Sequence, residues 1–255
     1  MPDDDELSSE DAEQETLVRR ARIARELIDS VRGLSPADVP DALCRACMTL
    51  LPDVSGLSVF VQGKDVDTGV VLCASDRVAA RLAEIQYTLG EGPCMEAVRL
   101  RAPVFATDLT RAPDARRWPL FSVQAAKAGA EAAFSIPLAG SVGQPLGTLD
   151  LYRDTAGSLS SDHVRTSLLV ADAVTLAVTA LDHTSMGPEG VVTWLEGVES
   201  DREEIHQATG MIMVQLGVTA AEAVLRLRAR AFAQSRTSTE IARAVIDRTT
   251  DMRLD

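Results

Sequence analysis

The chain has 255 residues, of which 46% are hydrophobic, and its formal net charge is −13. This length fits one sizeable domain and a smaller one. No stretch approaches the ~20 apolar residues of a membrane helix, and the acidic start from Asp3 to Glu6 is unlike a secretory signal. We therefore expect a cytoplasmic protein. The acidic balance argues against non-specific nucleic-acid binding, because such binding needs clustered Lys and Arg.

The first part of the chain predicts an acidic tail followed by an α+β domain. Residues 1–16 are polar and without periodicity, so we expect them to be disordered. From Leu17 to Val31 apolar residues recur at helical steps, and Gly33 ends that helix. Further helices are predicted at 40–51, 119–127 and 164–181, and strands at 56–62, 69–75, 103–106, 132–138 and 145–152. Helices around a mostly antiparallel sheet define an α+β fold, which we place at residues 17–186.

The cysteines lie in this domain and suggest no cross-link. The spacings of Cys44, Cys47, Cys73 and Cys94 suit neither a disulfide scaffold nor a four-ligand zinc site. We expect reduced thiols and no metal centre.

A helical domain is predicted at residues 191–255, after the break at Gly187-Pro-Glu-Gly190. Gly217 ends its first helix, and the sequences from Thr219 to Glu222 and from Thr237 to Glu240 predict capping boxes for the next two helices. Apolar residues of the first helix follow heptad spacing, which favours a homodimeric coiled-coil contact. The predicted dimer seam consists of Leu195, Val198, Ile205, Ile212 and Leu216.

This domain resembles the ANTAR family of transcription antitermination regulators. The resemblance rests on Arg202-Glu-Glu-Ile-His-Gln-Ala-Thr-Gly-Met-Ile-Met213, followed by Glu222-Ala223, Leu227-Arg228, Ala231 and Ile241-Ala242. It implies a dimer that binds paired RNA hairpins with small loops and so prevents a terminator from forming. Two positions depart from the family pattern: Thr209 stands where most members have Lys, and Ser238 where a Leu is usual.

Arginines are the candidate RNA contacts, because a guanidinium group both pairs with phosphate and stacks on exposed bases. Residues 219–253 carry seven Arg against four acids. The alternative is that these arginines form a solvated helix face with ion pairs, in a protein-interaction module that binds no RNA. The candidates are Arg202, Arg226, Arg228, Arg230, Arg236 and Arg243.

The preceding domain resembles the GAF family. The resemblance rests on Leu89-Gly-Glu-Gly-Pro-Cys94, Arg117-Trp-Pro119, Ser135-Ile-Pro-Leu138 and Leu146-Gly-Thr-Leu-Asp-Leu151. It implies a small molecule held between the sheet and its crossing loops, or a purely dimerising module. The candidate ligand contacts are Glu91, Cys94, Trp118 and Phe121, and the sequence names no cofactor.

No catalytic motif is present, so we do not expect an enzyme. A methionine sulfoxide reductase that uses Cys94 is the weakest alternative. As a regulator, the chain would respond to a ligand or redox event by shifting the helix at 164–181. This shift would pass across the Gly187–Gly190 break and change the helix that begins at Val191.

Overall fold

The computed structural model describes residues 4–62, 69–140, 145–184, 193–234 and 236–253. A five-stranded sheet forms the centre of the first domain, with strand order β2-β1-β5-β4-β3 and every neighbouring pair antiparallel. Its strands are β1 (Gly56–Gln62), β2 (Gly69–Ala74), β3 (Val104–Ala106), β4 (Ala132–Leu138) and β5 (Gly147–Arg153). The α+β prediction is confirmed.

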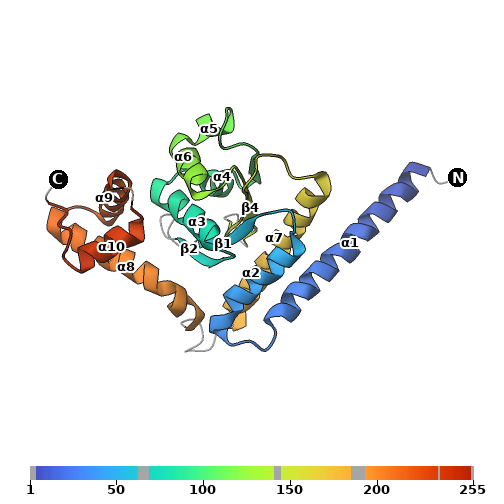
Figure 1. Ribbon diagram of the computed structural model, residues 1–255. Helices are drawn as coiled ribbons and strands as arrows, with labels where there is room; N and C mark the ends of the chain where they lie inside the picture. The colour runs from blue at the N-terminus through green and yellow to red at the C-terminus, as the bar shows by residue number, and fades with distance from the viewer. Residues whose placement is uncertain (1–3, 63–68, 141–144, 185–192, 235, 254–255) are drawn as a thin grey trace.

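Helices cover both faces of this sheet (Figure 1). Side chains alternate along each strand, so Leu57, Phe134 and Leu149 join a core with α1, α2 and α7, whereas Ala133 and Tyr152 join a second core with α3, α4 and α6. The helices are α1 (Asp4–Val31), η1 (Pro36–Asp38), α2 (Val39–Leu50), α3 (Arg77–Leu89), α4 (Pro93–Leu100), α5 (Asp114–Arg117), α6 (Pro119–Ala128) and α7 (Ser161–Thr184).

Helix α1 begins at Asp4, so the expectation of a disordered tail over residues 1–16 is corrected for residues 4–16. Four of its thirteen residues are Glu, a good helix former, and it contains neither Gly nor Pro. Acidic residues near a helix N-terminus also stabilise the helix, because they interact favourably with the positive end of its dipole. Once residues 17–31 are helical, each residue that extends the helix toward the N-terminus adds a backbone hydrogen bond. The residue types of 4–16 do not oppose this extension.

Helices α3, α4 and α5 were not predicted. Asp76 caps the first of them: its Oδ1 accepts hydrogen bonds from the backbone N–H of Val78 at 2.7 Å and of Ala79 at 2.9 Å. Gly90 ends it in the left-handed region, at φ 63°, a conformation that glycine adopts without strain. These two capping signals were present in the sequence.

The expectation of four reduced thiols is also corrected, because the structure pairs Cys44 and Cys73 as a disulfide. The two residues are 29 positions apart in sequence, but α2 packs on the sheet beside β2 and brings their Cα atoms to 6.1 Å. Cys47 and Cys94 are free and buried.

The second domain consists of α8 (Thr193–Leu216), α9 (Ala220–Ala233) and α10 (Ser238–Ile246). Its own core is built on small and aliphatic residues, among them Ala208, Ile212, Leu227 and Ile241. Gly217 lies at φ 67° and ends α8 as predicted. By itself, no helix of the described chain is both long and apolar enough to cross a bilayer, although α8 from Glu204 and α9, bent at their junction, pass that test as a pair.

Only one of the two predicted capping boxes is complete. Thr237 and Glu240 each accept the other's backbone N–H, at 3.0 and 2.7 Å. At α9 the Thr219 hydroxyl accepts the N–H of Glu222 at 3.3 Å, but the Glu222 carboxylate is bound by Arg226. The reciprocal half of that box is therefore replaced by an ion pair within the helix.

Candidate functional site

A row of polar residues crosses the sheet on the face covered by α3 and α4. Asp150 of β5 lies directly opposite Ser58 of β1 on one side and Ser135 of β4 on the other. All three side chains are buried. They line a cavity of about 10 Å³ together with Gln86 and Phe121, which is room for about one water molecule.

Asp150 is the charged member of this row and is only partly satisfied. Its Oδ2 accepts a hydrogen bond from the Thr148 hydroxyl at 2.9 Å. Its Oδ1 is buried and accepts no hydrogen bond from any residue that the structure describes. Burial raises the pKa of Asp150 to about 6, and the neighbouring Ser135 and Thr148 hydroxyls and Cys94 thiol oppose that rise. A donor group that reached Oδ1 would stabilise the carboxylate.

Cys94 lies beside this carboxylate at the start of α4. Its Sγ is 3.2 Å from the Thr148 hydroxyl, and its backbone N–H donates to Gln86 Oε1 at 2.7 Å. Burial and the neighbouring Asp150 raise the pKa of the Cys94 thiol well above its ordinary value. The group is therefore a neutral thiol at neutral pH, whereas nucleophilic cysteines act as thiolates.

The other predicted ligand contacts have different surroundings. Phe121 lines the cavity. Glu91 caps α6, because its Oε1 accepts the backbone N–H of Leu120 at 2.8 Å and of Phe121 at 3.0 Å. Trp118 is buried outside the cavity lining and donates from Nε1 to Glu96 at 3.0 Å. Of the four, only Phe121 and Cys94 therefore adjoin the polar row.

Glu96 accepts hydrogen bonds from both Trp118 and the exposed Arg117. Arg117 donates to both of its carboxylate oxygens, at 3.0 and 2.8 Å, and lies 4.5 Å from the Trp118 ring centroid. The hydrogen bond from Arg117 lowers the pKa of Glu96. This cluster joins α4 to the start of α6.

The helical domain packs against α3 of the sheet domain (Figure 1). The Arg228 guanidinium carbon lies 4.6 Å from the centroid of the Tyr87 ring. The Ser238 hydroxyl lies 3.1 Å from the Thr88 hydroxyl, and Ser238 is completely buried. The departure from the family pattern at Ser238 thus provides a polar contact between the domains.

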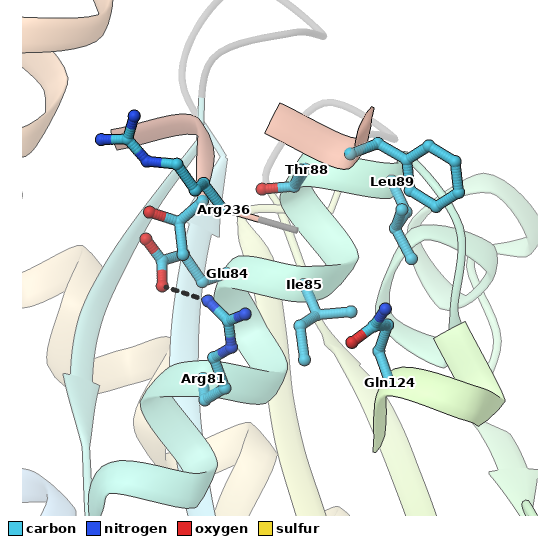
Figure 2. Close-up of a pocket in the computed structure, with 9 residues that line it drawn as sticks. Arg81, Glu84, Ile85, Thr88, Leu89, Gln124 and Arg236 are labelled. Carbon is cyan, nitrogen blue, oxygen red and sulfur yellow. Dashed lines mark ion pairs between the residues drawn. The ribbon is translucent and has the colours of Figure 1, made fainter. Parts of the chain in front are cut away.

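A small cavity of about 30 Å³ adjoins this contact. Figure 2 shows Glu84, Ile85 and Thr88 of α3 lining it, with Gln124 of α6 and Arg236 of the helical domain around it. Arg81 and Glu84 form an ion pair at 3.7 Å along the same helix. A cavity of this size has room for about one or two water molecules.

The remaining predicted RNA contacts bind other groups of the helical domain. Arg226 pairs with Glu222 and Arg243 with Glu204, each at 2.7 Å. Arg236 donates to the backbone carbonyl of Glu240 at 2.8 Å, and Arg230 to that of Asp251 at 3.4 Å. The side chain of Arg202 lies outside the described residues.

The predicted dimer seam lies largely inside the chain's own helical core where the structure describes it. Ile212 is fully buried there, and Ile205 and Leu216 pack against the same core. The side chains of Leu195 and Val198 lie outside the described residues. Helices α9 and α10 therefore cover the apolar stripe over 205–216. Heptad spacing alone did not distinguish packing against helices of the same chain from packing against a second chain.

Sequence reasoning missed Asp150, Ser58, Ser135, Tyr87 and Thr88. A signal existed for the first: Thr148 and Asp150 alternate with leucines in a predicted strand, which places two polar groups on one face. The serines become its neighbours only through strand pairing. Tyr87 and Thr88 lie on α3, where no helix was predicted, so no face could be assigned to them.

Comparisons with known proteins agree with this organisation. The GAF domain model matches residues 33–179 and the ANTAR domain model matches residues 195–246, which confirms both resemblances. A search of curated proteins gave no match.

Solved structures similar to this chain include several GAF domains. One is the GAF domain of an Acinetobacter phosphoenolpyruvate-protein phosphotransferase, with 12% identity, a TM-score of 0.47, and coverage of 68% of this chain and 97% of that one. The phycocyanobilin-bound GAF domain of a cyanobacterial phytochrome has 14% identity, a TM-score of 0.48, and coverage of 66% and 98%. The type II free methionine-R-sulfoxide reductase of Thermoplasma acidophilum has 17% identity, a TM-score of 0.41, and coverage of 57% and 93%. These likenesses assign no ligand or activity to this chain.

Proposed function

Because this chain belongs to the GAF domain family and carries an ANTAR domain after its sheet domain, we propose that it is a sensor-linked regulator that binds RNA. In this proposal two chains associate, each ANTAR domain engages one of two neighbouring hairpins, and a terminator is prevented from forming. The protein acts in the cytoplasm, where nascent transcripts are made. Both domains are of regulatory type, and the proposal assigns no catalytic step to either.

The ANTAR match over residues 195–246 is the observation that carries the RNA proposal. Its physical support is the set of arginines on α9 and α10, because guanidinium groups bind phosphate and stack on unpaired bases. The pairs of Arg226 with Glu222 and of Arg243 with Glu204 lie at least partly in solvent. Surface pairs of this kind are worth little, so a phosphate competes readily with the carboxylate.

The polar row around Asp150 supports a sensing role for the sheet domain. A ligand that carries a hydrogen-bond donor or a positive charge would satisfy the buried Oδ1 atom. Binding of a molecule larger than one water requires the wall formed by α3 and Phe121 to move.

Helix α3 connects this row to the ANTAR domain. Its residues Ala79, Leu82 and Gln86 line the cavity, while Tyr87 and Thr88 contact Arg228 and Ser238. Displacement of α3 by a ligand would therefore change how the ANTAR domain is held. The route through 164–181 and the linker stays a prediction, because residues 185–192 lie outside the described part of the chain.

RNA binding is tested with the full-length protein and an RNA of two adjacent hairpins, selected on that protein from a library with randomised loops. Affinity is then measured as salt is raised. Neutralisation of four phosphates predicts a loss of roughly 50- to 150-fold between 50 and 200 mM salt. If no RNA is selected, or if affinity is independent of salt, the proposal is wrong.

A protein-interaction module without RNA binding is the second candidate. The ion-paired arginines favour it, as do the eight Arg against nine acids over residues 199–255. The same experiment separates the two, because this candidate predicts that no hairpin RNA survives the selection.

A further inference from the structure

The arginines of helix α9 point to opposite sides of the ANTAR domain. Ala223, Leu227 and Ala231 form its buried stripe. On a helix of 3.6 residues per turn, Arg228 lies about 100° to one side of Leu227, whereas Arg226 and Arg230 lie on the other side. Arg228 accordingly faces Tyr87 of the sheet domain, and Arg226 and Arg230 border a groove on the outward side.

Two adjoining grooves occupy this outward side, with volumes of about 420 and 620 Å³. Arg253 borders both, and Arg248 borders the larger one. The larger groove also has Met211 and Val214 in its lining, and Val214 is 87% exposed. A volume of this size matches small-molecule sites and accommodates a nucleotide.

The charges along these grooves favour an anionic partner. Arg226, Arg230, Arg248 and Arg253 border them, and the one acid among the lining residues is Asp251, which Arg253 binds at 2.8 Å. Glu222, which Arg226 binds at 2.7 Å, and Asp247, the exposed neighbour of Arg248, lie outside the lining. Four guanidinium groups against these three carboxylates leave a local charge of +1.

Arg248 is the most available of the four. It makes no ion pair or side-chain hydrogen bond with any residue of the described ranges, and its side chain is exposed. Its backbone has φ 57°, a left-handed conformation that is uncommon for Arg. The N–H of Arg248 donates to the Val245 carbonyl at 3.1 Å, so the end of α10 holds this conformation and sets where the side chain emerges.

We infer that the outward grooves bordered by Arg226, Arg230, Arg248 and Arg253 are the surface on which RNA binds, and that the side carrying Arg228 serves to dock the sensor domain. The guanidinium groups bind phosphates, and an unstacked base of a hairpin loop lies on the apolar lining at Met211 and Val214. This inference rests on the proposed RNA function and names two arginines, Arg248 and Arg253, that the sequence did not single out. It also allows RNA binding while the domains remain docked.

The test compares full-length variants with the hairpin RNA selected on the wild-type protein. The outward double variant Arg248→Gln with Arg253→Gln removes two phosphate contacts. We expect it to weaken binding at least roughly tenfold and to reduce the slope of log affinity against log salt by about 1.4 to 1.8. The double variant Arg248→Lys with Arg253→Lys keeps the charges and is expected to retain most of the affinity. Arg116→Gln on α5, an exposed arginine of the sheet domain, is the matched control and should bind as the wild type does.

The outcomes separate the inference from the function. If the outward Gln variant binds as tightly as the wild type while Arg228→Gln abolishes binding, RNA uses the other face and the inference is overturned, but the proposed function stands. If the outward variant changes only the oligomeric state measured by sedimentation, the grooves hold a second copy, and the inference is again overturned. If the wild type itself binds no selected RNA, the proposed function fails.

Discussion

Arg228 of α9 stacks on Tyr87 of α3, with its guanidinium carbon 4.6 Å from the ring centroid. The contact joins the ANTAR domain to the helix that covers the polar row of the sheet domain. The family resemblance placed Arg228 among the RNA contacts, whereas in this arrangement the same side chain lies on a domain contact. Tyr87 was not singled out in the sequence.

Replacing Tyr87 by Ala should loosen the domain contact. A cation–π pair contributes about 0.5–2 kcal/mol, so we expect hydrogen exchange in α9 and α10 to accelerate roughly 2- to 30-fold if these helices exchange through undocking. Tyr87→Phe retains the aromatic face and serves as the control. Unchanged exchange in Tyr87→Ala would show that the stacking does not hold the domains together.

The raised pKa of Asp150 predicts how the free energy of unfolding depends on pH. Its folded-state pKa of about 6 lies above the ordinary value of ~3.9. The folded state therefore binds more protons than the unfolded state between these values, and the free energy of unfolding falls as pH rises from about 4 to about 6. Two pKa units correspond to roughly 3 kcal/mol. Asp150→Asn should remove this decline and be more stable than the wild type at pH 7.

Chemical denaturation at pH 4, 5, 6 and 7 measures this effect. Asp41→Asn replaces an exposed carboxyl at the start of α2 and is the control. The assignment is refuted if Asp150→Asn and the wild type show parallel pH profiles.

The two helix caps should differ in strength. Thr237→Ala disrupts a complete capping box, whereas Thr219→Ala removes a single hydrogen bond of 3.3 Å. Loss of an N-cap costs about 0.5–2 kcal/mol, and we expect Thr237→Ala near the upper end and Thr219→Ala near the lower end. Thermal unfolding of both variants gives the comparison, and an equal cost would contradict the difference between the caps.

Ile212 and Val214 test whether α8 buries its stripe within the chain. Ile212 is fully buried and Val214 is 87% exposed. We expect Ile212→Ala to cost about 2–5 kcal/mol and Val214→Ala to stay within about 0.5 kcal/mol. If Ile212 lay instead in a contact between two chains, its variant would mainly promote dissociation, and the loss of stability would depend on protein concentration.

The number of reactive thiols tests whether Cys44 and Cys73 form a disulfide. Denatured but unreduced protein should react with a thiol reagent at two positions, Cys47 and Cys94, because Cys44 and Cys73 are paired. After reduction all four should react. Four reactive thiols before reduction would show that the pair is open under the conditions of purification.

Much of the fold followed from local signals. Strands β1 and β4 begin and end at the predicted residues, and the complete capping box at Thr237 was legible because it needs only residues three positions apart. Helix α3 was not predicted, although Asp76 and Gly90 mark its ends in the sequence. The start of α1 escaped because an acidic composition suits both a solvated tail and a helix.

By itself the sequence determined the five strands, most of the helices, the two domain families and the presence of arginines near the C-terminus, because these depend on residue type and short spacing. Only the tertiary structure decided that Ser58 and Ser135 face Asp150, that Ile212 lies in the helical core, and that Arg228 meets Tyr87 while Arg248 and Arg253 border outward grooves. Such relationships arise where strands pair and helices pack. They bring together residues that are far apart in sequence, and no local sequence pattern indicates that these residues are close in space.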